Sequence, residues 1–166
     1  MIPMGRFGVI LLTVSSAVLS LSSCCEKKLY CGTKPLDFAF TGFPRSEVRS
    51  FTLKRFAIGD QWGKPLDSAQ YVYYGNAPVS LKPDTIMFSD YRTAGDPLSI
   101  TQGNDWEIYL PASGTSYVIT TIFDDNRQSQ MVRCNDDETS CARNITNFSL
   151  NNEWQSGGFA YIQKKE

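Results

Sequence analysis

The chain contains no histidine among its 166 residues, and this absence excludes several kinds of site. Ser–His and Cys–His nucleophile pairs need an imidazole base, and neither a Gly-x-Ser-x-Gly elbow nor a phosphate-binding glycine loop is present. The five cysteines form no Cys-x-x-Cys motif, so the closely spaced ligands of a zinc site are missing. We therefore expect no catalytic residue, no metal and no cofactor.

Long runs of basic residues are also absent. Lys and Arg total 16 against 17 acidic residues, and the adjacent basic pairs are Lys27-Lys28, Lys54-Arg55 and Lys164-Lys165. Binding to nucleic acid relies on many cations that follow the phosphates, and a polybasic membrane patch needs a cluster of them. The sequence therefore predicts no nucleic-acid partner and no polybasic patch.

A long apolar run occurs only once, between Phe7 and Leu21, just after the single positive side chain of Arg6. The run is shorter than the about 20 residues that cross a bilayer as a helix. A short basic segment, an apolar segment and then small residues are the layout of a signal peptide. We expect residues 1–23 to be this signal peptide.

The sequence Leu21-Ser22-Ser23-Cys24 resembles the lipobox of bacterial lipoprotein precursors. The resemblance implies that the Cys24 thiol receives a diacylglyceryl group and that cleavage makes Cys24 the acylated, palmitate-type N-terminus. A thiolate is the nucleophile suited to thioether formation, and several acyl chains hold a protein at the bilayer. Cys25 stands where an inner-membrane retention signal would have aspartate, so the resemblance implies the outer membrane and leaves the leaflet open.

The Cys-Cys-Glu-Lys-Lys start and the aromatic-rich body also resemble small lipoproteins of Bacteroidetes-type bacteria, a likeness that implies no activity. We expect residues 24–35 to be the lipidated N-terminus and a short linker. Its eleven residues from Cys25 to Pro35 span at most about 36–40 Å. A single folded domain, residues 36–166, follows.

Apolar residues in this domain recur with period two, between turns rich in Gly, Pro, Asn and Asp, which predicts short strands. In residues 50–56 the apolar Phe51 and Leu53 alternate with Thr52 and Lys54. The clearest predicted strands are Leu36–Thr41, Val48–Phe56, Gln70–Tyr74, Thr85–Phe88, Asp105–Leu110, Ser116–Phe123, Gln128–Cys134 and Phe159–Gln163. Weaker ones are Val79–Leu81, Leu98–Thr101 and Asn147–Leu150.

The predicted fold is all-β, an immunoglobulin-like β-sandwich, with a lipocalin-like β-barrel as the alternative. The acidic turn Asp124-Asp125-Asn126 predicts a hairpin between the strands on its two sides. An exported compartment favours disulfides. We expect a bridge between Cys134 and Cys141 across the polar loop that they flank, with Cys25–Cys31 as one of the open pairings.

Two features suggest ligand sites, and each has a plainer interpretation. Tyr71, Tyr73, Trp62 and Trp106 are candidates for an aromatic platform that binds sugars or another planar ligand, although such residues are more often packed in a core. Tyr74 and Trp154 extend the set. The acidic segments 124–126 and 135–138 have oxygen ligands for calcium, but Asp and Asn are also the residues that turns prefer.

These observations favour a non-enzymatic, lipid-anchored interaction or structural module of the cell envelope, whose partner is an envelope protein or a glycan. The alternative is a lipoprotein that binds carbohydrate or a small ligand through exposed aromatic residues. A hydrolase with a carboxylate pair is the weakest hypothesis, because no spacing singles out two of the 17 acids.

Overall fold

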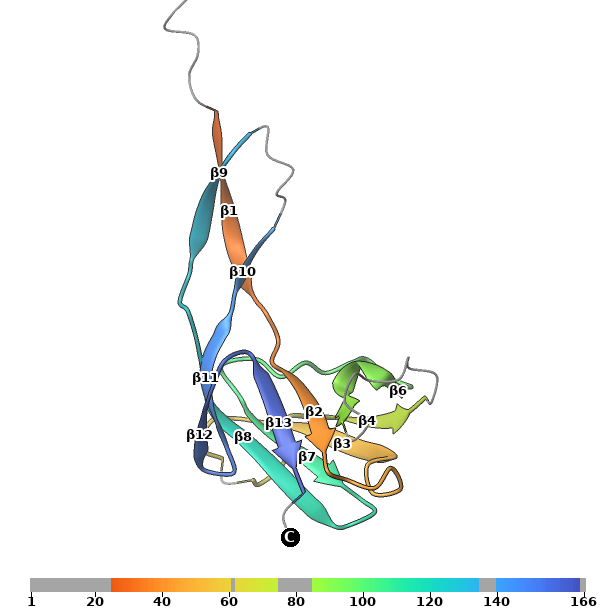
Figure 1. The fold of residues 1–166 in the computed structure, drawn as a ribbon. Coiled ribbons are helices and arrows are strands. Elements are labelled where there is room, and N and C mark those ends of the chain that lie inside the picture. Colours follow the sequence, from red (N-terminus) through yellow and green to blue (C-terminus); the bar gives the residue numbers. More distant parts are fainter. Residues whose placement is uncertain (1–24, 61, 75–84, 135–139, 165–166) are drawn as a thin grey trace, which may run out of the picture. The chain divides into compact units, whose positions relative to one another are not determined.

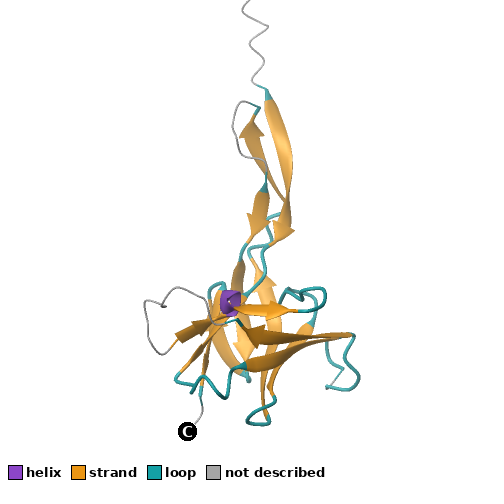
Figure 2. Ribbon diagram, turned by 90° about the vertical axis from the view of Figure 1, so that its right-hand side faces the viewer, coloured by secondary structure: helices purple, strands orange, loops and turns teal. Residues whose placement is uncertain are grey.

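The computed structural model describes residues 25–60, 62–74, 85–134 and 140–164. The predicted signal peptide, Cys24, residues 79–81 and the acidic segment 135–138 lie outside them. Within the described residues the chain forms thirteen strands and one short 3-10 turn, so the all-β prediction is confirmed (Figure 2). A search of the same residues found no helix with the length and apolar character needed to cross a membrane.

The chain divides into two compact units. The described part of unit 1 comprises residues 25–30, 129–134 and 140–141, and unit 2 comprises residues 31–128 and 142 onward.

Unit 2 contains two sheets. The larger has the order β12-β11-β8-β7-β3-β4-β6 and all its pairs are antiparallel; its strands are β12 (Glu153–Ser156), β11 (Ile145–Leu150), β8 (Thr115–Asp124), β7 (Asp105–Leu110), β3 (Ser50–Phe56), β4 (Asp67–Tyr73) and β6 (Tyr91–Thr93). The smaller has the order β13-β2-β5, with β13 (Phe159–Gln163) parallel to β2 (Asp37–Thr41) and β5 (Thr85–Met87) antiparallel to β2. Figure 1 shows β2 and β13 side by side across the larger sheet.

This arrangement is sandwich-like, as predicted. Among the described strands the larger sheet ends at β12 on one side and at β6 on the other, so it does not close on itself. The lipocalin-like barrel, which requires a closed sheet, is therefore not the fold of these residues.

The core lies between the two sheets and is rich in aromatic rings. Phe51 of β3 is fully buried, and its ring centroid lies 5.5 Å from that of Phe38 and 5.6 Å from that of Phe40, both of β2. Ring pairs at such distances stabilise by about 0.5–1.5 kcal/mol beyond the burial of their area. The alternation predicted for residues 50–56 and 105–110 is confirmed, because Phe51, Leu53, Trp106, Ile108 and Leu110 are all buried.

A third sheet has the order β10-β1-β9 and consists of β10 (Cys141–Arg143), β1 (Glu26–Thr33) and β9 (Ser129–Arg133). The antiparallel register of β1 and β9 runs from Glu26 opposite Arg133 to Tyr30 opposite Ser129. The expectation of a linker at residues 24–35 is therefore wrong for residues 26–33. Strand β1 was not predicted because its sequence is rich in charged residues and its partner strands lie about a hundred residues away in the chain.

The hairpin predicted at Asp124–Asn126 is also not formed. Strand β8 before this turn pairs with β7 and β11, so both of its edges are occupied. Strand β9 after the turn pairs with β1. The turn therefore leads the chain out of one sheet and into another.

The disulfide prediction was wrong in its pairing. Cys134 is bonded to Cys25, 109 residues earlier, and not to Cys141. Cys31 and Cys141 are also disulfide-bonded, so the proposed Cys25–Cys31 link is excluded as well. The cause is the β1–β9 register: Cys134 N–H donates to the Cys25 carbonyl at 2.9 Å, which continues the ladder and sets the two cysteines opposite each other.

Of the weaker strand predictions, Asn147–Leu150 is confirmed as part of β11. Residues 98–101 form no strand, and only Ile100 makes an isolated bridge, to Leu36. The short strands β6, β10 and β12 were not predicted, since three or four residues show too little periodicity.

The core arrangement makes a testable prediction about Phe51. Replacing Phe51 by Ala removes the ring that contacts both sheets, so the free energy of unfolding should fall by about 3–5 kcal/mol. Val72→Ala on the neighbouring strand β4 is the control, because Val72 is half exposed and should cost less than about 1 kcal/mol. Urea unfolding followed by circular dichroism measures both. Equal losses would contradict the described core.

Candidate functional site

Two of the predicted platform residues belong to the core. Tyr71 and Trp106 are buried, and Tyr71 stacks on Phe51 with centroids 4.9 Å apart. The Tyr71 hydroxyl donates to the Leu98 carbonyl at 2.8 Å and accepts the Leu98 N–H at 2.7 Å, while Trp106 Nε1 donates to the Thr101 carbonyl at 3.0 Å. Burial raises the pKa of Tyr71. Neither side chain is available to an external ligand, so this part of the prediction is wrong.

The other two predicted residues lie apart. Tyr73 packs against Tyr91 with ring centroids 5.7 Å apart. Trp62 packs against Phe56 at 5.1 Å. Phe56 ends β3, whereas the register of the β3–β4 pair sets Tyr73 beyond the opposite end of that ladder. Trp62 and Tyr73 therefore do not form a common platform.

A different pair of aromatic residues is exposed together. Phe123 of β8 and Trp154 of β12 have 49% and 62% of their surface exposed, with ring centroids 6.1 Å apart and planes only 10° from parallel. Asn147 of β11 is opposite Phe123, and Ser149, two residues on, is opposite Trp154. The two rings therefore share one face of the larger sheet. Trp154 belongs to the extended set of aromatic candidates, whereas Phe123 was not predicted as a site residue.

A β-bulge determines that Phe123 faces outward. Tyr117 and Ile119 point into the core, and a regular strand would also turn residues 121 and 123 inward. The register shifts between Ser149↔Thr120 and Asn147↔Phe123, which leaves an extra residue in β8. This bulge exchanges the two faces of the strand, so that Ile122 is buried and Phe123 is exposed.

Thr121 at the bulge has a φ of 52°. This left-handed conformation is rare for a β-branched residue and is strained. The strain is part of the local structure that turns Phe123 toward solvent.

Phe123 forms one wall of a hollow of about 520 Å³, which we call the Phe123 hollow. Its apolar side also includes Ile58, which is exposed. Its polar side includes Asn104, Asp105, Thr121 and Arg143. An apolar wall with a few polar groups that converge on the same space is typical of small-ligand sites.

Arg143 is held in place at this hollow. One guanidinium nitrogen, Nη2, donates to Thr33 Oγ1 at 2.6 Å, and Nε lies 3.5 Å from Asp124 Oδ2. The Asp124 side chain is almost fully buried, and its other oxygen accepts the Asn126 N–H at 2.9 Å. A cation fixed by these partners is prepared to bind an oxygen of a ligand at low entropic cost.

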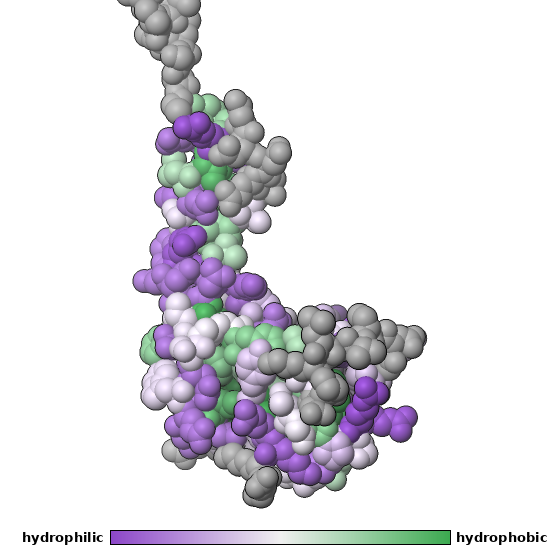
Figure 3. Space-filling view, in the orientation of Figure 1, coloured by the Kyte–Doolittle hydropathy of each residue, from purple (hydrophilic) through white to green (hydrophobic). Residues whose placement is uncertain are grey.

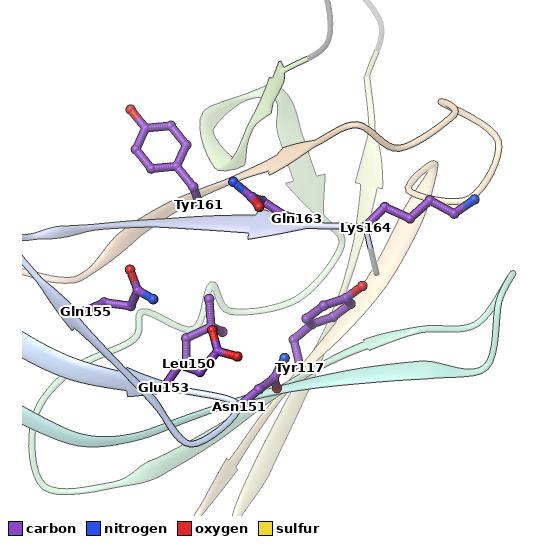
Figure 4. Close-up of a pocket in the computed structure, with 8 residues that line it drawn as sticks. All are labelled: Tyr117, Leu150, Asn151, Glu153, Gln155, Tyr161, Gln163 and Lys164. Carbon is purple, nitrogen blue, oxygen red and sulfur yellow. The ribbon is translucent and has the colours of Figure 1, made fainter. Parts of the chain in front are cut away.

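A second hollow, of about 460 Å³, lies beside the edge strands β12 and β13, and we call it the Tyr117 groove (Figure 4). Its lining is mostly polar and includes Asn151, Gln155 and Gln163. Burial and the negative charge of Glu47 raise the pKa of Tyr117 at this groove. Figure 4 shows the ring of Tyr161 directed away from Tyr117, so the groove offers hydrogen-bonding groups but no joint aromatic surface.

The acidic turn at residues 124–126 is explained by its own hydrogen bonds. Asp124 accepts the N–H of Asn126, and Asp125 accepts that of Arg127 at 3.2 Å. The bond from Arg127 is the main cause that lowers the pKa of Asp125. Across the described part of the chain, no group of three or more His, Cys, Asp or Glu side chains is placed to hold a metal ion.

Searches of protein-family models, curated proteins and solved structures found no match to this chain. The choice of a candidate site therefore depends on geometry alone. The Phe123 hollow combines one ring of the exposed Phe123–Trp154 pair, a strained bulge and a fixed cation, and it is the strongest candidate.

The bulge makes a prediction that separates Thr121 from its neighbour. Thr121→Gly relieves the strain of the left-handed φ at residue 121, which is worth about 1–2 kcal/mol. Glycine also makes the unfolded chain more flexible, which costs about 0.5–1 kcal/mol of stability. The free energy of unfolding should therefore stay equal or rise slightly. Thr120→Gly is the matched control, at a position without a positive φ, and should lose about 1 kcal/mol. Thermal unfolding of both variants measures the difference. A larger loss at Thr121 than at Thr120 would contradict the strained bulge.

Proposed function

We propose that this chain is a lipid-anchored, non-enzymatic interaction module of the cell envelope, held at the outer membrane through Cys24. The observation that supports it most strongly is the bond between Cys25 and Cys134. Disulfides persist in oxidising compartments outside the cytosol, which agrees with the signal peptide and lipobox of the sequence. The bonded cysteine is the residue directly after the proposed lipid-bearing one.

This proximity gives the disulfide a mechanical role in the proposal. Strand β1 starts at Glu26, two residues after Cys24, and the Cys25–Cys134 bond closes the end of the β1–β9 ladder. A flexible tether would let a domain move far from its anchor. Here a covalently locked strand pair follows the anchor, so the module is expected to act close to the bilayer.

We propose an immunoglobulin-like class for the sandwich of unit 2. Two packed sheets with an aromatic core support it. The larger sheet, with seven strands, exceeds the four or five strands of the sheets in immunoglobulin domains. The proposal therefore concerns the layer architecture and not a strand-by-strand match.

A second candidate function is the binding of carbohydrate, supported by the exposed Phe123–Trp154 pair beside the Phe123 hollow. Aromatic faces offer a large apolar contact area to the C–H face of a sugar ring. Asn104, Asp105 and Arg143 provide donors and acceptors for hydroxyl groups. In this form the module would hold a glycan close to the membrane.

The lipid anchor is tested by metabolic labelling with radioactive palmitate in a Gram-negative host. The unaltered chain should carry label in the outer-membrane fraction, and Cys24→Ser should carry none, because serine has no thiol for the thioether. Cys25→Ser is the control: it removes the disulfide and keeps the lipobox cysteine, so its label should remain. Label on Cys24→Ser would contradict the anchor.

The carbohydrate candidate is tested with the lipidated protein in detergent and a panel of oligosaccharides of β-linked glucose, xylose, mannose and N-acetylglucosamine. Trp154→Ala should weaken binding at least about tenfold, equivalent to about 1.4 kcal/mol. Tyr161→Ala, at the Tyr117 groove, should leave it unchanged. Isothermal titration calorimetry measures both affinities. Binding that is lost in the Tyr161→Ala variant and kept in the Trp154→Ala variant would contradict a site at the Phe123 hollow.

A further inference from the structure

Five exposed side chains share one face of the β1–β9 pair, and they are Glu26, Lys28, Tyr30, Met131 and Arg133, with Glu26 opposite Arg133. Lys28 is directly opposite Met131 in the register, and Tyr30, two residues after Lys28, points to the same side. Tyr30 has 78% and Met131 57% of its surface exposed, and Lys28 Nζ lies 5.2 Å from the centroid of the Tyr30 ring. We call this surface the Tyr30 face.

The other face of the pair is differently composed. Val132 on that face is buried, and Leu29 is half buried. The Cys25–Cys134 disulfide lies at the end of the same ladder. The strand pair therefore has one covered side and one open side, and the open side carries the aromatic ring, the thioether, the lysine and the opposite charges of Glu26 and Arg133. Figure 3 shows hydrophobic and strongly hydrophilic residues side by side on the visible face of unit 1.

We propose that the Tyr30 face lies on the surface of the lipid bilayer that holds Cys24, an inference that rests on the proposed lipid anchor. An extended chain of about 3.3 Å per residue lets Lys28 lie at most about 13 Å and Tyr30 at most about 20 Å from Cys24. Acyl chains at Cys24 keep these side chains beside the bilayer at a high effective concentration.

The chemistry of Lys28, Tyr30 and Met131 suits the headgroup region. Tyrosine is enriched at the membrane–water interface because its ring is apolar and its hydroxyl is polar. Methionine contributes flexible apolar area. Lysine near the surface is attracted to anionic headgroups, an effect of about fivefold in binding for one residue.

The proposed contact requires one orientation of the strand pair. The headgroup layer on one side of a bilayer is about 5–8 Å thick. A strand pair perpendicular to the bilayer would carry Tyr30, about 13 Å along β1 from Glu26, beyond this layer. A strand pair that lies flat brings Lys28, Tyr30 and Met131 into it together, with the covered face turned away.

The experiment uses the lipidated mature chain labelled with 3-fluorotyrosine, in liposomes of phosphatidylethanolamine and phosphatidylglycerol that contain a nitroxide on the headgroup. The Tyr30→Phe variant identifies the Tyr30 fluorine signal. This signal should lose at least twice as much intensity as that of Tyr74, which is 70% exposed in unit 2. Lys28→Glu should reduce the loss at Tyr30 at least twofold, and Lys64→Glu, the same charge change at an exposed site of unit 2, should not change it.

Equal losses at Tyr30 and Tyr74, in protein whose mass includes the acyl chains, would overturn the proposal and leave the lipid anchor intact. Broadening of the Tyr30 signal that depends on protein concentration and not on the nitroxide would assign the face to a second copy of the chain and would also overturn it. A mass without acyl chains would overturn both the anchor and this orientation.

Discussion

The ring contacts of Phe51 with Phe38 and Phe40 hold the two sheets of unit 2 together. Phe51 comes from the larger sheet and both partners come from β2, so these contacts cross the space between the layers. Tyr71 and Tyr91 extend the cluster on the side of the larger sheet, and each satisfies its hydroxyl with a backbone carbonyl. Because the core is built from large rings, the outer face of the larger sheet is free to carry a site.

The described residues of unit 1 form no comparable core. Val132 is the buried apolar residue of the β1–β9 pair, and a small three-stranded sheet such as β10-β1-β9 needs a hydrophobic face to be stable by itself. The Cys25–Cys134 bond closes a loop of 109 residues, which in the chain-entropy model is worth about 4–5 kcal/mol. Covalent closure therefore replaces hydrophobic burial in the part of the chain that follows the proposed anchor.

The sequence predicted features that depend on local periodicity and failed where distant pairing decides the structure. The alternation in residues 50–56 and 105–110 identified strands and their buried faces correctly. Strand β1 was missed, and so was the disulfide partner of Cys134. In both cases the paired residues lie about a hundred residues apart in the chain. The candidate site was missed for a related reason: alternation places Phe123 inward, and only the bulge at Thr121 reverses it.

The central claim is that a lipid anchor at Cys24 is followed directly by a disulfide-locked strand pair. The most direct measurement is the intact mass of the membrane-extracted protein before and after reduction. The account predicts residues 24–166 plus acyl chains, with a gain of four hydrogen masses on reduction because four cysteines are disulfide-bonded. A mass equal to the unprocessed chain, or no gain on reduction, would contradict it.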